Sequence, residues 1–313
     1  MPPEISVVIP SYNRSALLKR AIDSALTQTA PPREVIVVDD GSTDSTRELC
    51  AGYGNQIKYV WQKNAGASAA RNAGVIRARS PWIAFLDSDD YWTPFHLATM
   101  TKAIEQTDGE AGFYFSDMQM SERKGCASLW KLANFAPPKS VHLTNDGTSW
   151  AFLRWQPMVL QASVFRRDVW VGEGGLDPRF RLKHDTDLFF RLSISRKVCA
   201  VSGVSCIYGD GDSDIRLTTA LHPSKAGYWE ESILLLRGVL SRFPNLSPRY
   251  KRIARWNLAS AHCGLFRLYW ASRNVWKSVR HLRMSGLADP RFALLLLTRR
   301  ADANRPVIVP EYD

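Results

Sequence analysis

The segment IAFLDSDDYWTP, residues 83 to 94, places three carboxylates within four positions, directly after a run of apolar residues. These are Asp87, Asp89 and Asp90, and a second acidic pair, Asp39 and Asp40, follows the apolar run at 35 to 38. Carboxylates that share a crevice repel one another unless a cation or hydrogen-bond donors compensate them. Oxygen ligands without nearby His or Cys favour a hard ion, Mg²⁺ or Mn²⁺, and such ions commonly bridge to phosphates. The pattern indicates a metal-held nucleotide; the alternative is a simple turn whose carboxylates cap a helix.

Strand-like and helix-like segments alternate along the first 106 residues, in the way that builds a parallel sheet. We expect strands at 5 to 10, 34 to 39, 57 to 62 and 82 to 87, and helices at 15 to 28, at 66 to 78 and from Thr93 to about Gln106. Ligands of open α/β sheets bind just beyond the carboxyl ends of the strands. The two acidic strand ends should therefore share one crevice. The predicted fold class is α/β, with a Rossmann-like, mostly parallel central sheet flanked by helices.

Charge divides the chain into two parts. Residues 222 to 313 contain 16 Lys and Arg against 6 Asp and Glu, whereas residues 1 to 221 contain 25 against 24. From His222 onward the strand signals stop, and cap-Pro pairs predict helices at about 223 to 243, 248 to 270, 273 to 285 and 290 to 300. We expect a catalytic domain at 1 to 221, with a donor half to about 106 and an acceptor half from 107, followed by a basic helical region at 222 to 313.

Other classes of protein are disfavoured by the composition. The longest apolar runs are far shorter than the roughly 18 residues of a spanning helix, and the start MPPEISVVIP has a Glu where a signal peptide needs positive charge. We therefore expect a cytoplasmic protein. The five cysteines show no CxxC spacing, which indicates reduced thiols rather than a disulfide framework or a zinc site.

Six motifs occur in order along the chain: ISVVIPSYNR (5 to 14), EVIVVDDGSTDST (34 to 46), NAGASAARNAG (64 to 74), WIAFLDSDDYW (82 to 92), QASVFRRDVW (161 to 170) and HDTDLFFRL (184 to 192). This series resembles the family 2 glycosyltransferases, which have the GT-A fold, over roughly residues 4 to 215. Each motif alone is weak, but the ordered set is specific. The resemblance implies a nucleotide-sugar donor, with UDP as the expected nucleotide, and an inverting transfer to a hydroxyl of a saccharide or lipid-linked acceptor in surface polysaccharide or glycan synthesis.

Donor-site roles follow from the resemblance, position by position. Pro10 and Tyr12 would flank the base, and Asp40 would accept the imino N–H of the base. Arg71 would lie at the nucleoside end and Asp87, next to Ser88, on the ribose side. Asp89 would ligate the Mn²⁺ or Mg²⁺ that bridges the diphosphate. Each side chain also has an ordinary structural explanation: Tyr12 as strand-end packing, Arg71 as a surface charge.

The acceptor side is less regular. In the family the base that deprotonates the acceptor is the Asp of a Glu-Asp pair that opens a helix. Here the pair reads His184-Asp185, so Asp185 is the expected base, with Asp187 as the alternative in another register. Many members place a His or Arg in the loop after the last strand, where this chain reads YGDGDSDIR (208 to 216); Arg216 or His222 is a candidate substitute. The irregular segment 125 to 150 is expected to form the acceptor wall.

Two other functions compete with transfer. The first is binding without catalysis: the chain would retain the nucleotide pocket but would have lost sugar transfer, and its helical part would act as an assembly module. His184, in place of the usual Glu, is the feature that favours this function. A nucleotidyltransferase also has an α/β fold with a nucleotide-binding crevice. The Gly-rich phosphate-binding loop of that class is missing from this sequence.

The basic helices have two interpretations as well. Arg and Lys alternate with Trp, Tyr and Phe, which suits the headgroup zone of an anionic membrane. The other interpretation is a helical appendage packed by its aromatic face. Nucleic acid is not expected as a partner, because no recognised binding motif accompanies the charge.

Overall fold

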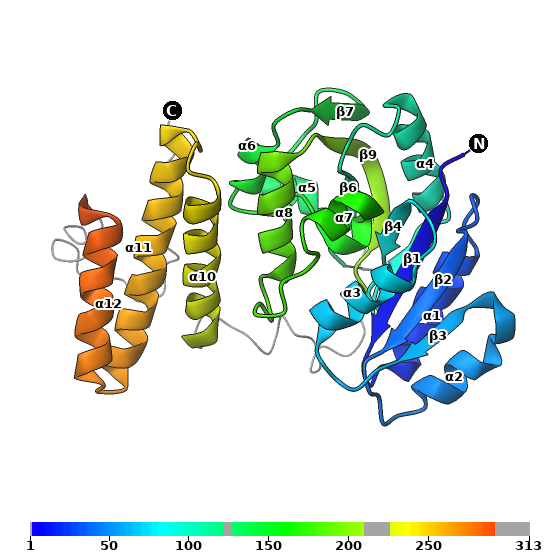
Figure 1. The fold of residues 1–313 in the computed structure, drawn as a ribbon, viewed down its shortest axis with the longest axis horizontal. Helices are drawn as coiled ribbons and strands as arrows, with labels where there is room; N and C mark the ends of the chain where they lie inside the picture. The colour runs from blue at the N-terminus through cyan, green and yellow to red at the C-terminus, as the bar shows by residue number, and fades with distance from the viewer. Residues whose placement is uncertain (1, 122–126, 210–225, 292–313) are drawn as a thin grey trace. The chain divides into compact units, whose positions relative to one another are not determined.

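The computed structural model describes residues 2–121, 127–209 and 226–291 of the chain (Figure 1). The chain divides into two compact units, Met1–Asp212 and Ser213–Asp313, which are described separately. The predicted domain boundary between residues 221 and 222 lies outside the described residues and stays a prediction.

The first unit contains a nine-stranded sheet whose first half is parallel. Its strands are β1 (Ile5–Ser11), β2 (Glu34–Asp39), β3 (Lys58–Trp61) and β4 (Trp82–Phe85), in the order β3-β2-β1-β4. The connecting helices are α1 (Ser15–Leu26), α2 (Thr46–Gly52) and α3 (Ala67–Arg77). The predicted strands and helices of this half are confirmed to within a few residues, because their β-branched runs are long and well delimited.

Helices cover both faces of the parallel half, which explains why β1 and β2 are apolar without alternation. Val7 and Ile9 pack in one core cluster with the apolar stripe of α1. Val8, on the opposite face, packs with α3. A Cβ atom at Gly74 of α3 would lie 2.3 Å from a methyl carbon of Val8, so only glycine permits this close approach.

The helix predicted from Thr93 begins later than expected. Residues Tyr91–Trp92 form the short strand β5, and α4 spans His96–Gln106. β5 pairs antiparallel with β9, and the Thr93 carbonyl accepts a hydrogen bond from Gln28 Nε2 (2.8 Å). This long-range pairing overrides the local Thr-Pro cap signal.

The second half of the sheet is mixed. Its strands are β6 (Phe113–Gln119), β7 (Val141–Thr144), β8 (Ser163–Arg166) and β9 (Val198–Ile207). The strand order continues β4-β8-β6-β9-β5, and β7 pairs with β9 outside this order. Strand β8 runs antiparallel to its neighbours β4 and β6, whereas β6 and β9 are parallel to each other. The segment expected to be irregular, 125 to 150, contains α5 (Leu129–Ala133), β7 and the start of α6 (Thr148–Ala151).

Helix α8 (His184–Ser195) is fixed to the sheet by its apolar face. Leu188, Phe189 and Leu192 are buried, as the sequence pattern predicts. The Phe113 ring lies 5.4 Å from that of Phe189 and 5.6 Å from that of Phe165, measured between centroids. Large buried aromatic rings contribute strongly to packing energy, so the first turn of α8 is held firmly in place. The short helix α7 (Arg167–Gly172) precedes it.

The second unit is helical in its described part. It comprises α10 (Ala226–Arg242), α11 (Pro248–Ala271) and α12 (Val275–Ala288), with α11 packed against both others (Figure 1). Three of the four predicted helices are thus confirmed, and most of the fourth, 290 to 300, lies outside the described residues. A Cβ atom at Gly264 would lie 2.4 Å from the Trp229 ring, which places α10 and α11 in close contact.

Two sequence expectations concern membranes and thiols. Among the described helices, none combines the length and the apolar character that crossing a bilayer requires. Cys50, Cys199, Cys206 and Cys263 are free and buried, and Cys126 lies outside the described residues.

Candidate active site

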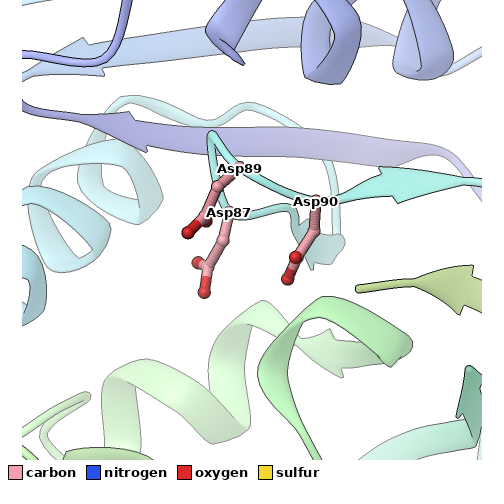
Figure 2. A group of neighbouring side chains, drawn as sticks. All are labelled: Asp87, Asp89 and Asp90. Atoms are coloured by element: carbon pink, nitrogen blue, oxygen red, sulfur yellow. The ribbon is translucent and has the colours of Figure 1, made fainter. Parts of the chain in front are cut away.

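The acidic cluster lies in the turn between β4 and β5. Carboxylate oxygens of Asp87, Asp89 and Asp90 all lie within 4.8 Å of one another. The three side chains leave the turn on the same side (Figure 2). The N–H of Asp90 donates to the Asp87 carbonyl (3.1 Å), and Ser88 between them is buried. The tight turn therefore places Asp90 on the same side as Asp87 and Asp89, whereas in an extended strand Asp90 would point to the opposite face.

Two guanidinium groups form ion pairs with this cluster, one from helix α3 and one from the residue that precedes α1. Arg71 of α3 forms an ion pair with Asp87, and Arg14, just before α1, forms one with Asp89. Arg20 of α1 also donates to the Asp89 carbonyl (3.3 Å). The side chains of Arg71 and Asp87 are 6% and 24% exposed. In such a partly buried setting, loss of one partner from the pair costs about 3–5 kcal/mol.

Asp90 is the buried member of the cluster. It accepts hydrogen bonds from Gln161 Nε2 (3.0 Å) and from the N–H of Gly209 (3.1 Å). Burial, and then the charges of Asp87 and Asp89, raise the pKa of Asp90 to about 8. A cation bound to the cluster would relieve this crowding of negative charge. An all-oxygen set of converging carboxylates fits a hard divalent ion.

The second acidic strand end is connected to the first through α3. β1 lies between β2 and β4, so the carboxyl ends of β2 and β4 are two strand spacings apart, about 10 Å. Asp40 accepts hydrogen bonds from Gln62 Nε2 (2.7 Å) and from the N–H groups of Ala65 (2.9 Å) and Gly66 (2.7 Å). Gly66 is the N-cap of α3, and Arg71 in that helix reaches Asp87.

Asp40 therefore has a structural role that the sequence analysis did not foresee: it fixes the loop that enters α3. Its neighbour Asp39 accepts from the N–H of Ser42 (2.8 Å) and the Tyr59 hydroxyl (2.6 Å), so Asp39 stabilises the turn that follows β2. Pro10 is buried near the end of β1, and Tyr12 follows that strand with a 46% exposed side chain. An exposed ring at the strand end is available for stacking.

The N-terminus of α8 joins the site through His184. Arg71 Nη1 lies 3.3 Å from His184 Nε2, and His184 Nδ1 lies 3.3 Å from the Arg181 carbonyl. A guanidinium can only donate, so His184 Nε2 accepts and Nδ1–H donates, which makes the imidazole neutral. Burial lowers the pKa of His184, in agreement with a neutral ring. The residue that replaces the usual Glu is thus an acceptor that helps to hold Arg71.

Asp185, the expected base, lies in the first turn of α8. Its Oδ1 accepts from the N–H (2.6 Å) and the hydroxyl (3.3 Å) of Thr186. Asp187, the alternative base, forms an ion pair with Arg191 of the same helix (2.8 Å). Asp187 therefore has a structural partner, which favours Asp185 for proton transfer.

Some partners at the site were missed from sequence. The sequence does not identify Arg14, Arg20 or Gln161 as partners of the cluster, although Arg14 ends the first motif and Gln161 begins the fifth. Their partners are 69 to 75 residues away along the chain, so no local pattern marks them. The loop 208 to 216 and the candidates Arg216 and His222 lie outside the described residues, apart from residues 208 and 209.

The chain is similar to known glycosyltransferases. Residues 6–152 match the pattern of the family described as "Glycosyl transferase family 2". A validoxylamine A glucosyltransferase of Streptomyces hygroscopicus subsp. limoneus is 48% identical over 107 residues, 32% of this chain and 24% of the relative. Glycosyltransferase GlyA of Streptococcus pneumoniae serotype 4 is 39% identical over 118 residues, 36% of this chain and 17% of the relative. An uncharacterised glycosyltransferase of Rickettsia typhi is 31% identical over 191 residues, 61% of this chain and 58% of the relative. In each case the matched part is less than two thirds of the relative's length.

Solved structures share the fold. S. aureus TarS (residues 1–349) superposes with a TM-score of 0.64 and 18% identity, over 93% of this chain and 83% of TarS. The same protein in complex with UDP-GlcNAc gives a TM-score of 0.66. The family match, the ordered motifs and the strand-end carboxylates agree. Residues 6–152 therefore match a glycosyltransferase family 2 domain, and the chain has the GT-A fold of TarS.

Proposed function

We propose that this protein transfers a sugar from a nucleoside diphosphate sugar to a hydroxyl group of a saccharide or lipid-linked acceptor, with inversion at the anomeric carbon. The observation that carries the proposal is the convergence of Asp87, Asp89 and Asp90 beside Arg71, which links them to the first turn of α8. Arg71 thus connects the carboxylate cluster to His184, which directly precedes the expected base Asp185 at the start of α8. UDP is the expected nucleotide, and the UDP-GlcNAc complex of TarS and the glucosyltransferase relative support a UDP-linked hexose.

The residues of this chain have separate tasks in the proposed reaction. Pro10, Tyr12, Asp40 and Arg71 bind the nucleoside, with Asp87 and Ser88 on the ribose side. Asp89, supported by its neighbours in the cluster, would hold Mn²⁺ or Mg²⁺, and the ion would stabilise the negative charge of the departing diphosphate.

Asp185 takes the proton of the attacking hydroxyl. The acceptor oxygen forms a bond to the anomeric carbon while the bond from that carbon to the diphosphate oxygen breaks, and the nucleoside diphosphate leaves. Alignment of the two substrates in the crevice supplies much of the rate enhancement.

Substitution of Asp89 by Ala tests this function. We expect the variant to lose turnover of UDP-sugars, both hydrolysis and transfer, while its circular dichroism stays that of the wild type. Glu105→Ala is the control, because Glu105 is an exposed carboxylate of helix α4 outside the cluster. Near-normal turnover of Asp89→Ala in a UDP-sugar assay would reject the site.

The second candidate function is nucleotide-sugar binding without transfer, in an assembly role. It is favoured by His184 in place of the usual Glu. If the wild type binds UDP and Mn²⁺ in calorimetry but shows no donor turnover with any acceptor or with water, this second function replaces the first.

We also propose that the protein acts in the cytoplasm, in peripheral contact with the anionic inner face of the cell membrane. The support is the basic excess of residues 222 to 313 and an exposed apolar stripe on α12, formed by Val275, Val279 and Leu282 with Trp276 beside it. Trp276 is 88% exposed, and Trp on a basic amphipathic helix suits the headgroup layer.

A further inference from the structure

The second unit contains a pocket with an unusual lining. Its volume is about 670 Å³, and it lies between the first two turns of α11 and the residues that follow α12. Lys251, Arg252 and Arg255 line it from α11, and Arg291 lines it from the other side. One acidic residue, Asp289, is also in the lining, so the charged side chains sum to a net charge of +3. No part of the sugar-transfer mechanism uses this pocket.

Arg291 is held in a fixed orientation. Asp289, which is 5% exposed, accepts from Arg291 Nε (3.0 Å) and Nη2 (2.6 Å). The Arg291 guanidinium also lies 6.0 Å from the centroid of the Trp256 ring. The bidentate pairing with Arg291, and to a smaller extent the charge of Arg252, lower the pKa of Asp289, so this carboxylate stays ionised; a single negative charge faces four cations.

The three cations of α11 form no ion pair within the described part of the protein, although Arg252 lies close enough to Asp289 to lower the pKa of that carboxylate. No carboxylate of residues 2–121, 127–209 or 226–291 lies within ion-pair distance of Lys251, Arg252 or Arg255. Lys251 and Arg255 are four residues apart, and Arg252 and Arg255 three, so like charges face one another on one side of α11. Such spacings destabilise a helix. The positive end of the α11 dipole adds to the same potential, since Pro248 at the first helical position lines the pocket as well.

We propose that this pocket binds a phosphate-bearing ligand, of the size of a phosphodiester or pyrophosphate group. Guanidinium groups pair with phosphate oxygens in a bidentate fashion, and two arginines with a lysine give charge-assisted hydrogen bonds from several directions. Bound phosphate removes the repulsion among the three cations of α11. The proposal does not depend on sugar transfer, because the pocket is formed by residues 248 to 291 alone.

Calorimetric titration of the full-length protein with inorganic pyrophosphate tests the pocket. The titration buffer contains EDTA, so that no divalent ion bridges pyrophosphate to the aspartate cluster. Its ionic strength is low, so that salt screens the charges of the pocket only weakly. We expect Arg252→Gln/Arg255→Gln to bind about ten-fold more weakly than the wild type, because two charge-assisted partners are lost. The control is Arg280→Gln/Arg283→Gln, which removes the same charge from α12 outside the pocket.

A second experiment, cosedimentation with lipid vesicles, distinguishes a lipid headgroup from a soluble or polymeric phosphate ligand. If the pocket takes a lipid headgroup, Arg252→Gln/Arg255→Gln also cosediments less than the wild type with phosphatidylglycerol vesicles. If it takes a phosphate of a soluble or polymeric ligand, vesicle binding is unchanged while pyrophosphate binding falls. The proposal is overturned if the pocket variant binds pyrophosphate like the wild type, or if the α12 control loses as much affinity.

Discussion

At the scale of single residues, the site depends on one arginine with two acceptors. Arg71 pairs with Asp87 and donates to His184, so it connects the donor carboxylates with the helix that carries the expected base. A Glu at position 184 would supply a second negative charge to Arg71. The neutral imidazole supplies a lone pair instead. The contact with Arg71 is preserved, but the site has one negative charge fewer than it would have with Glu.

This role of His184 leads to a first prediction at residue scale. His184→Phe leaves the Arg71 donor without this acceptor, at a cost of about 1–3 kcal/mol, and kcat/KM for the donor should fall about ten-fold or more. His184→Gln keeps an acceptor and should retain most activity. Steady-state kinetics of donor turnover measure both, with His142→Phe on β7 as the control. Equal kinetics of the Phe and Gln variants would show that the acceptor is unimportant.

Asp185 and Asp187 offer a second, paired test. Asp185→Asn should reduce transfer by about 10²–10⁴-fold through loss of the base, while calorimetry shows unchanged affinity for UDP. Asp187→Asn loses the ion pair with Arg191. This variant should have a lower melting temperature than the wild type but a nearly unchanged rate constant for transfer. The reverse outcome would assign the base to Asp187.

At the scale of elements, the predictable parts are those with strong local patterns. The strands at 5 to 10 and 34 to 39 and the apolar face of α8 follow from their residues. The antiparallel pairing of β4 with β8 could not be predicted, because the two short strands are about 80 residues apart. The same holds for β5, whose pairing with β9 precedes the expected helix start at Thr93 and is marked by no local pattern.

The exposed stripe of α12 gives the prediction at this scale. Trp276→Ala/Val279→Ser removes two apolar side chains whose burial in a membrane contributes about 1.5–3 kcal/mol each. The fraction that cosediments with phosphatidylglycerol-containing vesicles should therefore fall at least several-fold. Phe95→Ala/Val171→Ser removes two exposed apolar side chains of the first unit and should bind vesicles like the wild type. Equal binding by both double variants would remove α12 from the membrane contact.

At the scale of the whole molecule, the chain combines a charge-balanced unit with a basic one. The carboxylates of the turn at 87 to 90 were predictable because they follow a buried strand and because parallel strands end at one edge. The ion pairs of Arg14 with Asp89 and of Arg71 with Asp87 were not predictable, since a sequence does not show which distant cation folds back onto which acid. The hydrogen bonds of Asp40 to residues 62 to 66 were missed for the same reason.

The central claim is that this cluster binds a nucleoside diphosphate together with a divalent ion. The most direct measurement is a calorimetric titration of the wild-type protein and the Asp89→Ala variant with UDP, each with Mn²⁺ and with EDTA. We predict that Mn²⁺ strengthens UDP binding to the wild type by at least about ten-fold, as expected for a metal-bridged diphosphate, and has little effect on the variant. Equal UDP affinity with and without Mn²⁺, or the same Mn²⁺ effect in the variant, would contradict the account.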